Sequence, residues 1–312
     1  METRRIGSLE VSLVGLGCNN FGMRIDEEQS TAVVHAALDA GITLFDTADT
    51  YGGTKSEEFL GRALATHRDD VVIATKFASP HGNDATRCGA SARWIAQAVE
   101  DSLRRLGSDH IDLYQQHLPD NTVPIEETLE ALDTLVRDGK VREIGNSNFS
   151  SAQIDEADTV SREDGWARFV SAQNHFSLLE RRPLRKVVPA CERLDLKMLP
   201  YFPLANGLLT GKYTRGESAP EGTRLANAPT ERVDMVLNEH NFDVVDRLTE
   251  WAESSGHAIL ELAFAWLAAQ PAMGSIIAGA TKPEQVHANV ASGHWKLTPG
   301  DLAEIDGILG PL

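Results

Sequence analysis

Polar side chains that can move protons follow several short apolar runs of this sequence. Asp46 directly follows one such run, and Tyr51 lies in the loop beyond it. Lys76 and His117 come just after the next two runs. A carboxylate, a phenol, an ammonium and an imidazole could together perform general acid–base chemistry, if the fold brings them to one place.

Three later runs also end in polar groups. Ser147 and Asn148 follow the first, Gln173 the second, and Tyr201 the third. One polar residue at the end of a buried strand is commonplace, but so long a series is hard to explain by packing alone. If the strands form a barrel, these ends meet on one face, which is where barrel enzymes place their active sites.

The elements that must position these residues alternate along the chain. Short β-rich runs are separated by helical patterns, and several of the helical patterns begin at Asp or Ser and end before Gly. Such repeated strand–helix units predict a parallel sheet with right-handed crossovers. The predicted strands are Val14–Gly17, Ile42–Phe45, Val71–Ala74, Ile111–Tyr114, Val141–Ile144, Phe169–Ala172, Met198–Tyr201 and Ser275–Ala278. The predicted helices are Glu27–Ala40, Ser56–Ala65, Ser91–Leu106, Ile125–Asp138, Ser151–Glu163 and Leu184–Leu194, with one more before the last strand.

Eight predicted strands favour a closed α/β barrel over a doubly wound open sheet. No Pro/Gly/Ser-rich linker divides the 312 residues, so we expect a single domain over residues 1–312. The expected fold is a (β/α)8 TIM barrel with an N-terminal β-hairpin that turns at Gly7-Ser8. A long loop, from Phe202 to about Val236, follows the seventh strand. Loops of this length in compact domains are usually functional.

One glycine-rich turn, at Gly15 and Gly17, partly matches the dinucleotide-binding pattern GxGxxG. Asn20 stands where the third glycine belongs, and the first predicted helix begins only near Glu27. A pyrophosphate could not then sit at that helix N-terminus, as the motif requires. The favoured interpretation is a turn that brings the backbone close to a ligand.

Charge and cysteine content narrow the function classes. The formal net charge is −17, which disfavours nucleic acid and anionic membranes as partners. The three cysteines, Cys18, Cys88 and Cys191, are far apart and form no CxxC pair, so we expect neither a disulfide framework nor a structural metal. The N-terminus lacks the apolar stretch of a signal peptide. A cytoplasmic location is the default expectation.

The motifs together resemble the aldo-keto reductase superfamily over nearly the whole chain and in the expected order. The matching segments are Leu44-Phe45-Asp46-Thr47-Ala48 through Tyr51-Gly52, Ser56-Glu57, Thr75-Lys76, Ile111-Asp112-Leu113-Tyr114 to His117, Gly139-Lys140-Val141-Arg142 to Asn148, Gln173-Asn174, Pro203-Leu204, Gly207, Leu209-Thr210-Gly211-Lys212-Tyr213, and Gly279-Ala280 to Asn289. The resemblance implies the barrel fold and NADPH-dependent reduction of a small carbonyl substrate.

Four residues match the catalytic tetrad of that superfamily: Asp46, Tyr51, Lys76 and His117. Carbonyl reduction adds a hydride to carbon and leaves an oxygen that needs a proton. Tyr51 would supply it, Lys76 would lower the phenol's pKa, and Asp46 would hold Lys76 charged. His117 would orient the carbonyl and donate to its oxygen.

The resemblance also implies where NADPH binds. Asp46, Ser147, Asn148 and Gln173 would meet the nicotinamide end, where Tyr201 would stack on the ring; His175, nearby, is expected to pack instead of contacting the cofactor. Lys282 is the candidate for the 2′-phosphate. The other expected cofactor residues are Pro203, Leu204, Gly207, Leu209, Gly211 and Lys212 over the pyrophosphate, and Gly279, Ala280, Thr281, Gln285 and Asn289 at the adenosine.

The substrate pocket is expected to draw on Phe21, Met23, Phe77 and the long loop, an apolar wall that suits aromatic or medium aliphatic aldehydes and ketones. Phe202 departs from the superfamily pattern, which has a small hydroxyl residue there. Two alternatives share the fold: a cofactor-sensing binding subunit that resembles potassium-channel β subunits, and an oxidoreductase acting on a sugar or natural product. The oligomeric state is not predicted.

Overall fold

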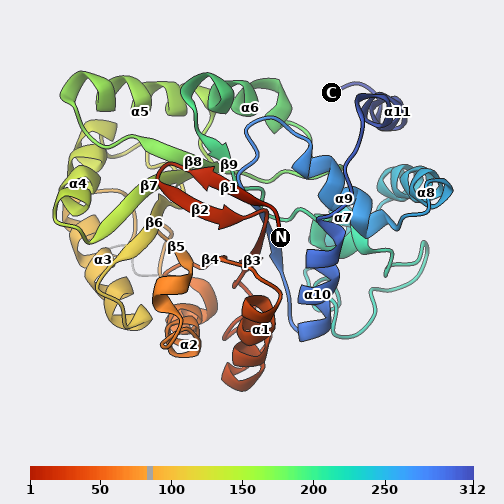
Figure 1. Ribbon diagram of the computed structural model, residues 1–312, viewed down its shortest axis with the longest axis horizontal. Helices are drawn as coiled ribbons and strands as arrows, with labels where there is room; N and C mark the ends of the chain where they lie inside the picture. The colour runs from red at the N-terminus through yellow and green to blue at the C-terminus, as the bar shows by residue number, and fades with distance from the viewer. Residues whose placement is uncertain (83–86) are drawn as a thin grey trace.

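The computed structural model describes residues 1–82 and 87–312. Its centre is an eight-stranded parallel sheet in the order β10-β3-β4-β5-β6-β7-β8-β9, curled into a barrel with helices around it (Figure 1). The barrel strands are β3 (Val14–Gly17), β4 (Leu44–Asp46), β5 (Val72–Phe77), β6 (Ile111–Gln116), β7 (Val141–Ser147), β8 (Phe169–Gln173), β9 (Lys197–Met198) and β10 (Ile276–Gly279). The predicted (β/α)8 class is confirmed.

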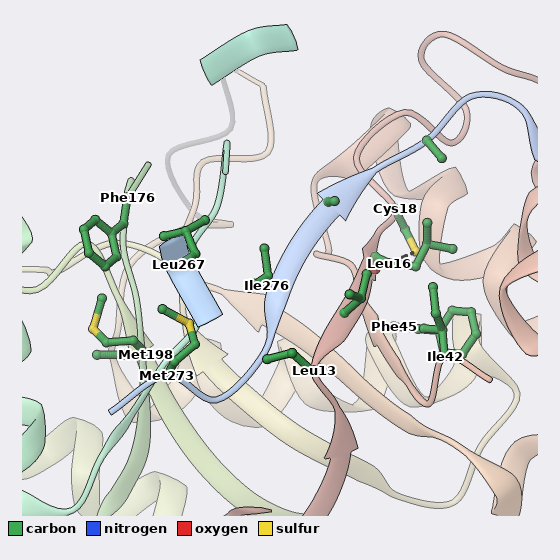
Figure 2. Close-up of a cluster of buried hydrophobic side chains, with 14 of the residues drawn as sticks. Leu13, Leu16, Cys18, Ile42, Phe45, Phe176, Met198, Leu267, Met273 and Ile276 are labelled. Carbon is green, nitrogen blue, oxygen red and sulfur yellow. Dashed lines mark hydrogen bonds between the residues drawn. The ribbon is translucent and has the colours of Figure 1, made fainter. Parts of the chain in front are cut away.

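The two edge strands, β9 and β10, meet through the segment just before β10. The Met198 amide donates to the Ala272 carbonyl at 2.7 Å, and the Gly274 amide donates to the Met198 carbonyl at 2.9 Å. Figure 2 shows Met198 and Met273 together at this junction, beside the apolar side chains of β10 and β3. These bonds close the sheet, so the strand ends form one ring instead of a row.

A hairpin of β1 (Thr3–Ile6) and β2 (Leu9–Ser12) precedes the barrel, as the sequence predicts. Ile6, Leu9 and Val11 are buried in a cluster with barrel residues such as Leu44 and Leu113. The hairpin lies across the middle of the barrel in Figure 1. It therefore covers the end of the barrel at which the strands begin, and the site must lie at the other end.

The first six helices follow one another around the outside of the sheet (Figure 1). Their ends carry the expected signals: in α3 the Ser91 hydroxyl caps the Trp94 amide, and Gly107 ends the helix with a φ of 63°. The α-helices are α1 (Glu27–Asp39), α2 (Lys55–Ala63), α3 (Ala92–Leu106), α4 (Ile125–Arg137), α5 (Ser151–Asp164), α6 (Pro183–Leu194), α7 (Thr230–Val236), α8 (Glu239–Ser254), α9 (Ile259–Ala268), α10 (Pro283–Ser292) and α11 (Pro299–Leu309). Three 3-10 helices are η1 (Tyr51–Thr54), η2 (Arg68–Asp70) and η3 (Ala205–Thr210).

Several predicted bounds and elements differ from the structure. The seventh strand is only Lys197–Met198, where Met198–Tyr201 was expected, because Pro200 has no amide hydrogen to extend the ladder. The long segment after it contains η3 and α7, whose short apolar patterns give no clear period. Helices α8, α10 and α11 were also not predicted.

Within the described ranges, no helix has both the length and the apolar character to span a membrane.

Candidate active site

A cavity of about 510 Å³ opens where the barrel strands end. Its floor contains Asp46 from β4 and Gln173 from β8, and its walls come from the loops that follow β3, β6, β9 and β10. Pockets of this size hold small molecules or cofactors. Because every parallel strand points the same way, side chains far apart in sequence converge here.

Asp46, in this floor, forms a buried ion pair with Lys76, which lies beneath it. The Lys76 ammonium donates to both carboxylate oxygens of Asp46, at 2.8 and 2.7 Å, and to the Thr47 carbonyl at 2.7 Å. The side chain of Lys76 is fully buried. Burial works to lower the pKa of Lys76, but the charges of Asp46 and Tyr51 outweigh it, and the pKa lies above its ordinary value. The ammonium is therefore charged in spite of its burial.

Tyr51 lies above this pair, with Lys76 Nζ 5.2 Å from the centre of its ring. Burial raises the pKa of Tyr51, and the Lys76 ammonium opposes the rise by its charge and by a hydrogen bond. The lowering influence expected from the sequence is present, but the net pKa is above the ordinary value. At neutral pH the phenol therefore carries its proton and can act as an acid.

The loop that carries Tyr51 is held by a close backbone contact at Gly52. Its φ is 59°, and a Cβ there would lie 2.3 Å from the Phe21 carbonyl oxygen. Only glycine fits such a position without strain.

His117 faces Tyr51 across the cavity floor. The ring centres are 5.7 Å apart with the planes at 78°. Burial, followed by the charge of Lys76, lowers the pKa of His117 to about 3. The imidazole is therefore neutral at neutral pH, and among the described residues its Nδ1 is buried without a partner. Tyr51 and His117 thus present two neutral donors to the same part of the cavity.

A set of amides and hydroxyls lies beside these four residues. Gln173 Nε2 donates to Asp46 Oδ1 at 2.8 Å, and Ser147 Oγ donates to the Gln173 carbonyl at 2.9 Å. The Tyr201 hydroxyl donates to Asn148 Oδ1 at 2.8 Å. These groups can bind a planar amide, because they include both donors and acceptors.

The other part of the cavity is lined by three cations: Arg24, Lys212 and Arg224. Burial lowers the pKa of Arg224 to about 10, and nearby Arg24 adds to the effect. Burial also lowers the pKa of Lys212, again with the charges of both arginines contributing. Like charges gathered in a partly buried wall favour an anionic ligand, although the whole chain is acidic.

The backbone around this cationic wall is tightly packed. Gly207 has a φ of 97°, and a Cβ there would lie 2.5 Å from Lys212 Nζ. Phe202 has a left-handed φ of 51° without being glycine. Two guanidinium groups contact its ring: that of Arg224 lies 5.2 Å from the ring centre and that of Arg232 lies 5.4 Å from it. Backbone strain of this kind is concentrated at functional sites.

Most of the residues expected at the site line the cavity. Asp46, Tyr51, His117, Ser147, Asn148, Gln173, Tyr201, Pro203, Leu204, Gly207, Lys212, Gly279, Thr281, Gln285 and Asn289 all do so. Lys76 lies directly beneath them. The structure does not bring the others to the wall: Leu209 and Ala280 are buried, Gly211 ends η3, and the Lys282 side chain is exposed at the start of α10.

The expectation for the pocket mouth needs correction. Phe21 and Phe77 are fully buried in the hydrophobic core and do not line the cavity, and Met23 is 62% exposed. Successive side chains of a strand point to opposite faces, so Lys76 points into the barrel and Phe77 points toward the helices. There the ring of Phe77 packs on Tyr114, with centres 4.9 Å apart.

The structure also shows cavity residues that were not predicted. Asn19, Asn20 and Arg24 come from the loop after β3, and Arg224 comes from the long loop after β9. Arg224 donates to Asn19 Oδ1 at 3.0 Å and to Asn20 Oδ1 at 3.2 Å. The sequence signals were general: a glycine-rich turn before Asn19 was expected to approach a ligand, and the long loop that contains Arg224 was expected to line the substrate pocket.

Comparisons with known proteins agree with this geometry. The Aldo/keto reductase family model matches residues 13–309. The chain is 38% identical over 308 residues to Aldo-keto reductase YhdN of Bacillus subtilis (strain 168), covering 96% of this chain and 91% of that protein. It is 32% identical over 334 residues to versiconal hemiacetal acetate reductase of Aspergillus parasiticus, covering 98% and 96%.

Two further proteins similar to this chain have names that indicate other functions. The chain is 32% identical over 300 residues to a probable voltage-gated potassium channel subunit beta of Oryza sativa subsp. japonica, covering 93% of this chain and 90% of that protein. The solved structure of glycerol dehydrogenase AKR11B4 from Gluconobacter oxydans superposes with a TM-score of 0.84 at 32% identity, covering 99% of this chain and 97% of that one. With its family match over nearly the whole length, this chain belongs to the aldo/keto reductase family of oxidoreductases.

Proposed function

We propose that the protein is an NADPH-dependent reductase of aldehydes or ketones, with Tyr51 as general acid. The observation that carries this proposal is that one cavity joins a group of proton-transferring side chains to a group of cations. At one end lie Tyr51 and His117 above the Asp46–Lys76 pair, and at the other lie three cations. From the net charge of −17 we further infer an enzyme of small molecules with no nucleic acid or membrane partner. A cytoplasmic location is inferred from the three widely spaced cysteines, which form no CxxC pair.

The residues present suit a phosphorylated nicotinamide cofactor. Ser147, Asn148 and Gln173 would hold its carboxamide, and Tyr201 would stack on its ring. Arg24, Lys212 and Arg224 would hold the pyrophosphate. Helix α10 begins beside Thr281, so its N-terminus and Lys282 would favour the 2′-phosphate. Gln285 and Asn289 would lie along the adenine.

When bound, the reduced cofactor supplies a hydride to the substrate carbon. Tyr51 gives its proton to the substrate oxygen as negative charge develops there. His117 donates a hydrogen bond to the same oxygen and orients the carbonyl, because its neutral ring has one N–H. Lys76 stabilises the phenolate that Tyr51 becomes, and Asp46 holds Lys76 in place.

The electrostatics favour this direction of proton transfer. The phenol is protonated before the reaction because burial raises its pKa. The fixed ammonium of Lys76 then favours the phenolate once the proton has left.

The test is consumption of NADPH with an activated aromatic aldehyde, measured for the wild type and for Tyr51→Phe. We expect the substitution to lower kcat by about 10²–10⁴-fold, because it removes the hydroxyl that gives the proton, while NADPH affinity stays within about twofold. The same assay with NADH measures cofactor preference. Full activity in Tyr51→Phe would exclude the proposed acid.

The similarity to a potassium channel subunit beta supports a second candidate, a cofactor-binding partner of a membrane protein. It would use the same cavity without needing fast turnover. NADPH binding without turnover of a broad panel of aldehydes, ketones and sugars would favour it.

A further inference from the structure

His175 and Tyr201 form a parallel stack at the nicotinamide end of the cavity. Their ring centres are 5.5 Å apart and the planes meet at only 14°. Tyr201 lines the cavity, whereas His175 does not. His175 therefore supports the face of Tyr201 that points away from the cavity.

The backbone fixes this arrangement. Beyond the ends of β8 and β9, the chain pairs His175 with Tyr201 in a parallel bridge. The Tyr201 amide donates to the Asn174 carbonyl at 3.1 Å, and the Phe176 amide donates to the Tyr201 carbonyl at 3.4 Å. Neighbouring residues of parallel strands project their side chains from the same face, so the two rings must lie side by side.

The far end of the Tyr201 ring is held separately. Its hydroxyl donates to Asn148 Oδ1 at 2.8 Å, and Asn148 Nδ2 donates to the His117 carbonyl at 3.0 Å. Phe202 closes the side, with its ring nearly perpendicular to both stacked rings, at 83° to Tyr201 and 89° to His175. Of the surfaces of Tyr201, the one that faces the cavity is open.

His175 is suited to neutral stacking. Burial lowers the pKa of its imidazole, Glu180 opposes the shift, and Arg182 and Arg232 add to it. The ring is therefore uncharged at neutral pH. An uncharged flat ring can lie against a phenol in an offset stack without the hydration that an imidazolium would require.

We propose that His175 is a positioning residue for the nicotinamide ring: it holds Tyr201 flat against the place where that ring binds. The inference rests on the proposed function, since it assigns the open face of Tyr201 to the nicotinamide. His175 acts only through Tyr201. Its removal should weaken binding of the nicotinamide half of the cofactor and leave the adenosine half unaffected.

Two ligands separate these halves. NADPH contains both, and adenosine 2′,5′-bisphosphate contains only the phosphorylated adenosine. The dissociation constants of both ligands are measured by quenching of tryptophan fluorescence. The variants are His175→Leu, which fills the space without a flat ring, and His175→Phe, which restores a flat neutral ring. His240→Ala, at an exposed position on α8, is the matched control.

We expect His175→Leu to weaken NADPH binding about three- to tenfold, in line with the loss of one aromatic stack. The dissociation constant of adenosine 2′,5′-bisphosphate should stay within about twofold of the wild-type value. His175→Phe should restore NADPH affinity to near the wild-type value. If His175 had a general structural role, its loss would weaken the binding of both ligands equally, and phenylalanine would not specifically restore that binding.

The outcomes separate the positioning role of His175 from the proposed function. If the wild type binds both ligands and His175→Leu binds NADPH as tightly as the wild type, the positioning role is wrong while the proposed function stands. Equal weakening of both ligands would overturn the positioning role as well. If the wild type binds neither ligand, the proposed function fails, and this inference fails with it.

Discussion

Gln173 Nε2 lies 2.8 Å from Asp46 Oδ1, and the bond joins β8 to β4 across the interior of the barrel. The same amide group is one of those proposed to bind the nicotinamide carboxamide. Asp46 also accepts two hydrogen bonds from Lys76. A residue proposed to bind the cofactor is thus connected through one carboxylate to the ammonium beneath Tyr51.

Asp46→Asn should destabilise the fold as well as abolish catalysis. It leaves the fully buried Lys76 ammonium without its counter-charge, which costs about 3–5 kcal/mol of unfolding free energy. The double variant Asp46→Asn/Lys76→Met removes both charges and should recover much of that loss. Urea unfolding of the two variants measures this. A double variant no more stable than the single one would show that the buried charge is not the cause.

Arg224→Ala should weaken NADPH binding by about 10- to 100-fold, the range expected for a charge-assisted hydrogen bond in a partly buried site. Arg232→Ala is the matched control, because Arg232 also contacts the Phe202 ring but does not line the cavity. Its NADPH affinity should change by less than about threefold, as an exposed cation–π contact allows. Fluorescence titration compares the two. Similar losses in both variants would point to a loss of loop structure instead of an anion contact.

Lys282→Ala should lower the affinity for NADPH and leave that for NADH unchanged, because only NADPH carries the 2′-phosphate. The side chain is exposed at the start of α10 and free to reach a ligand there. Titrations with both cofactors test the assignment. A parallel loss for both would move Lys282 to a pyrophosphate contact.

The pH dependence of stability should report the neutral state of His117. The unfolded chain titrates this residue near 6.5, and the folded protein holds its pKa at about 3. Between these values the unfolded state binds more protons, so the free energy of unfolding falls as the pH falls, by up to about 1.4 kcal/mol per pH unit. Between pH 7 and 4.5, the midpoint temperature of thermal unfolding should therefore fall more steeply with falling pH for the wild type than for His117→Gln. Parallel curves would contradict the lowered pKa.

Phe202→Ser, which restores the residue type common in the superfamily, should speed NADPH release about 5- to 30-fold. The ring contacts both Arg224 and Arg232, and each exposed cation–π contact contributes about 0.5–1 kcal/mol. Phe202→Tyr keeps the ring and should release the cofactor at the wild-type rate. Stopped-flow fluorescence measures both. Unchanged release from the serine variant would show that the loop is held without this stack.

The sequence by itself determined the barrel class and the order of its elements. Strand–helix alternation is a local property, because each helix is predicted from the spacing of its own apolar residues and from its own capping residues. In α3 these capping residues are Ser91 and Gly107. It also indicated which strand ends carry Asp46, Lys76 and His117, because those residues directly follow apolar runs. The family match over residues 13–309 agrees with the family that these residues resemble.

Only the tertiary structure decided which side chains face the cavity. Phe77 follows Lys76 directly, yet it points to the opposite face of the strand and packs on Tyr114. Arg24 and Arg224 are 200 residues apart, and no local pattern pairs them; the closing of the barrel and the path of the long loop bring both to one wall. The stack of His175 on Tyr201 likewise depends on two strands meeting side by side. Periodicity records burial along one element, whereas these contacts join different elements and are fixed by packing.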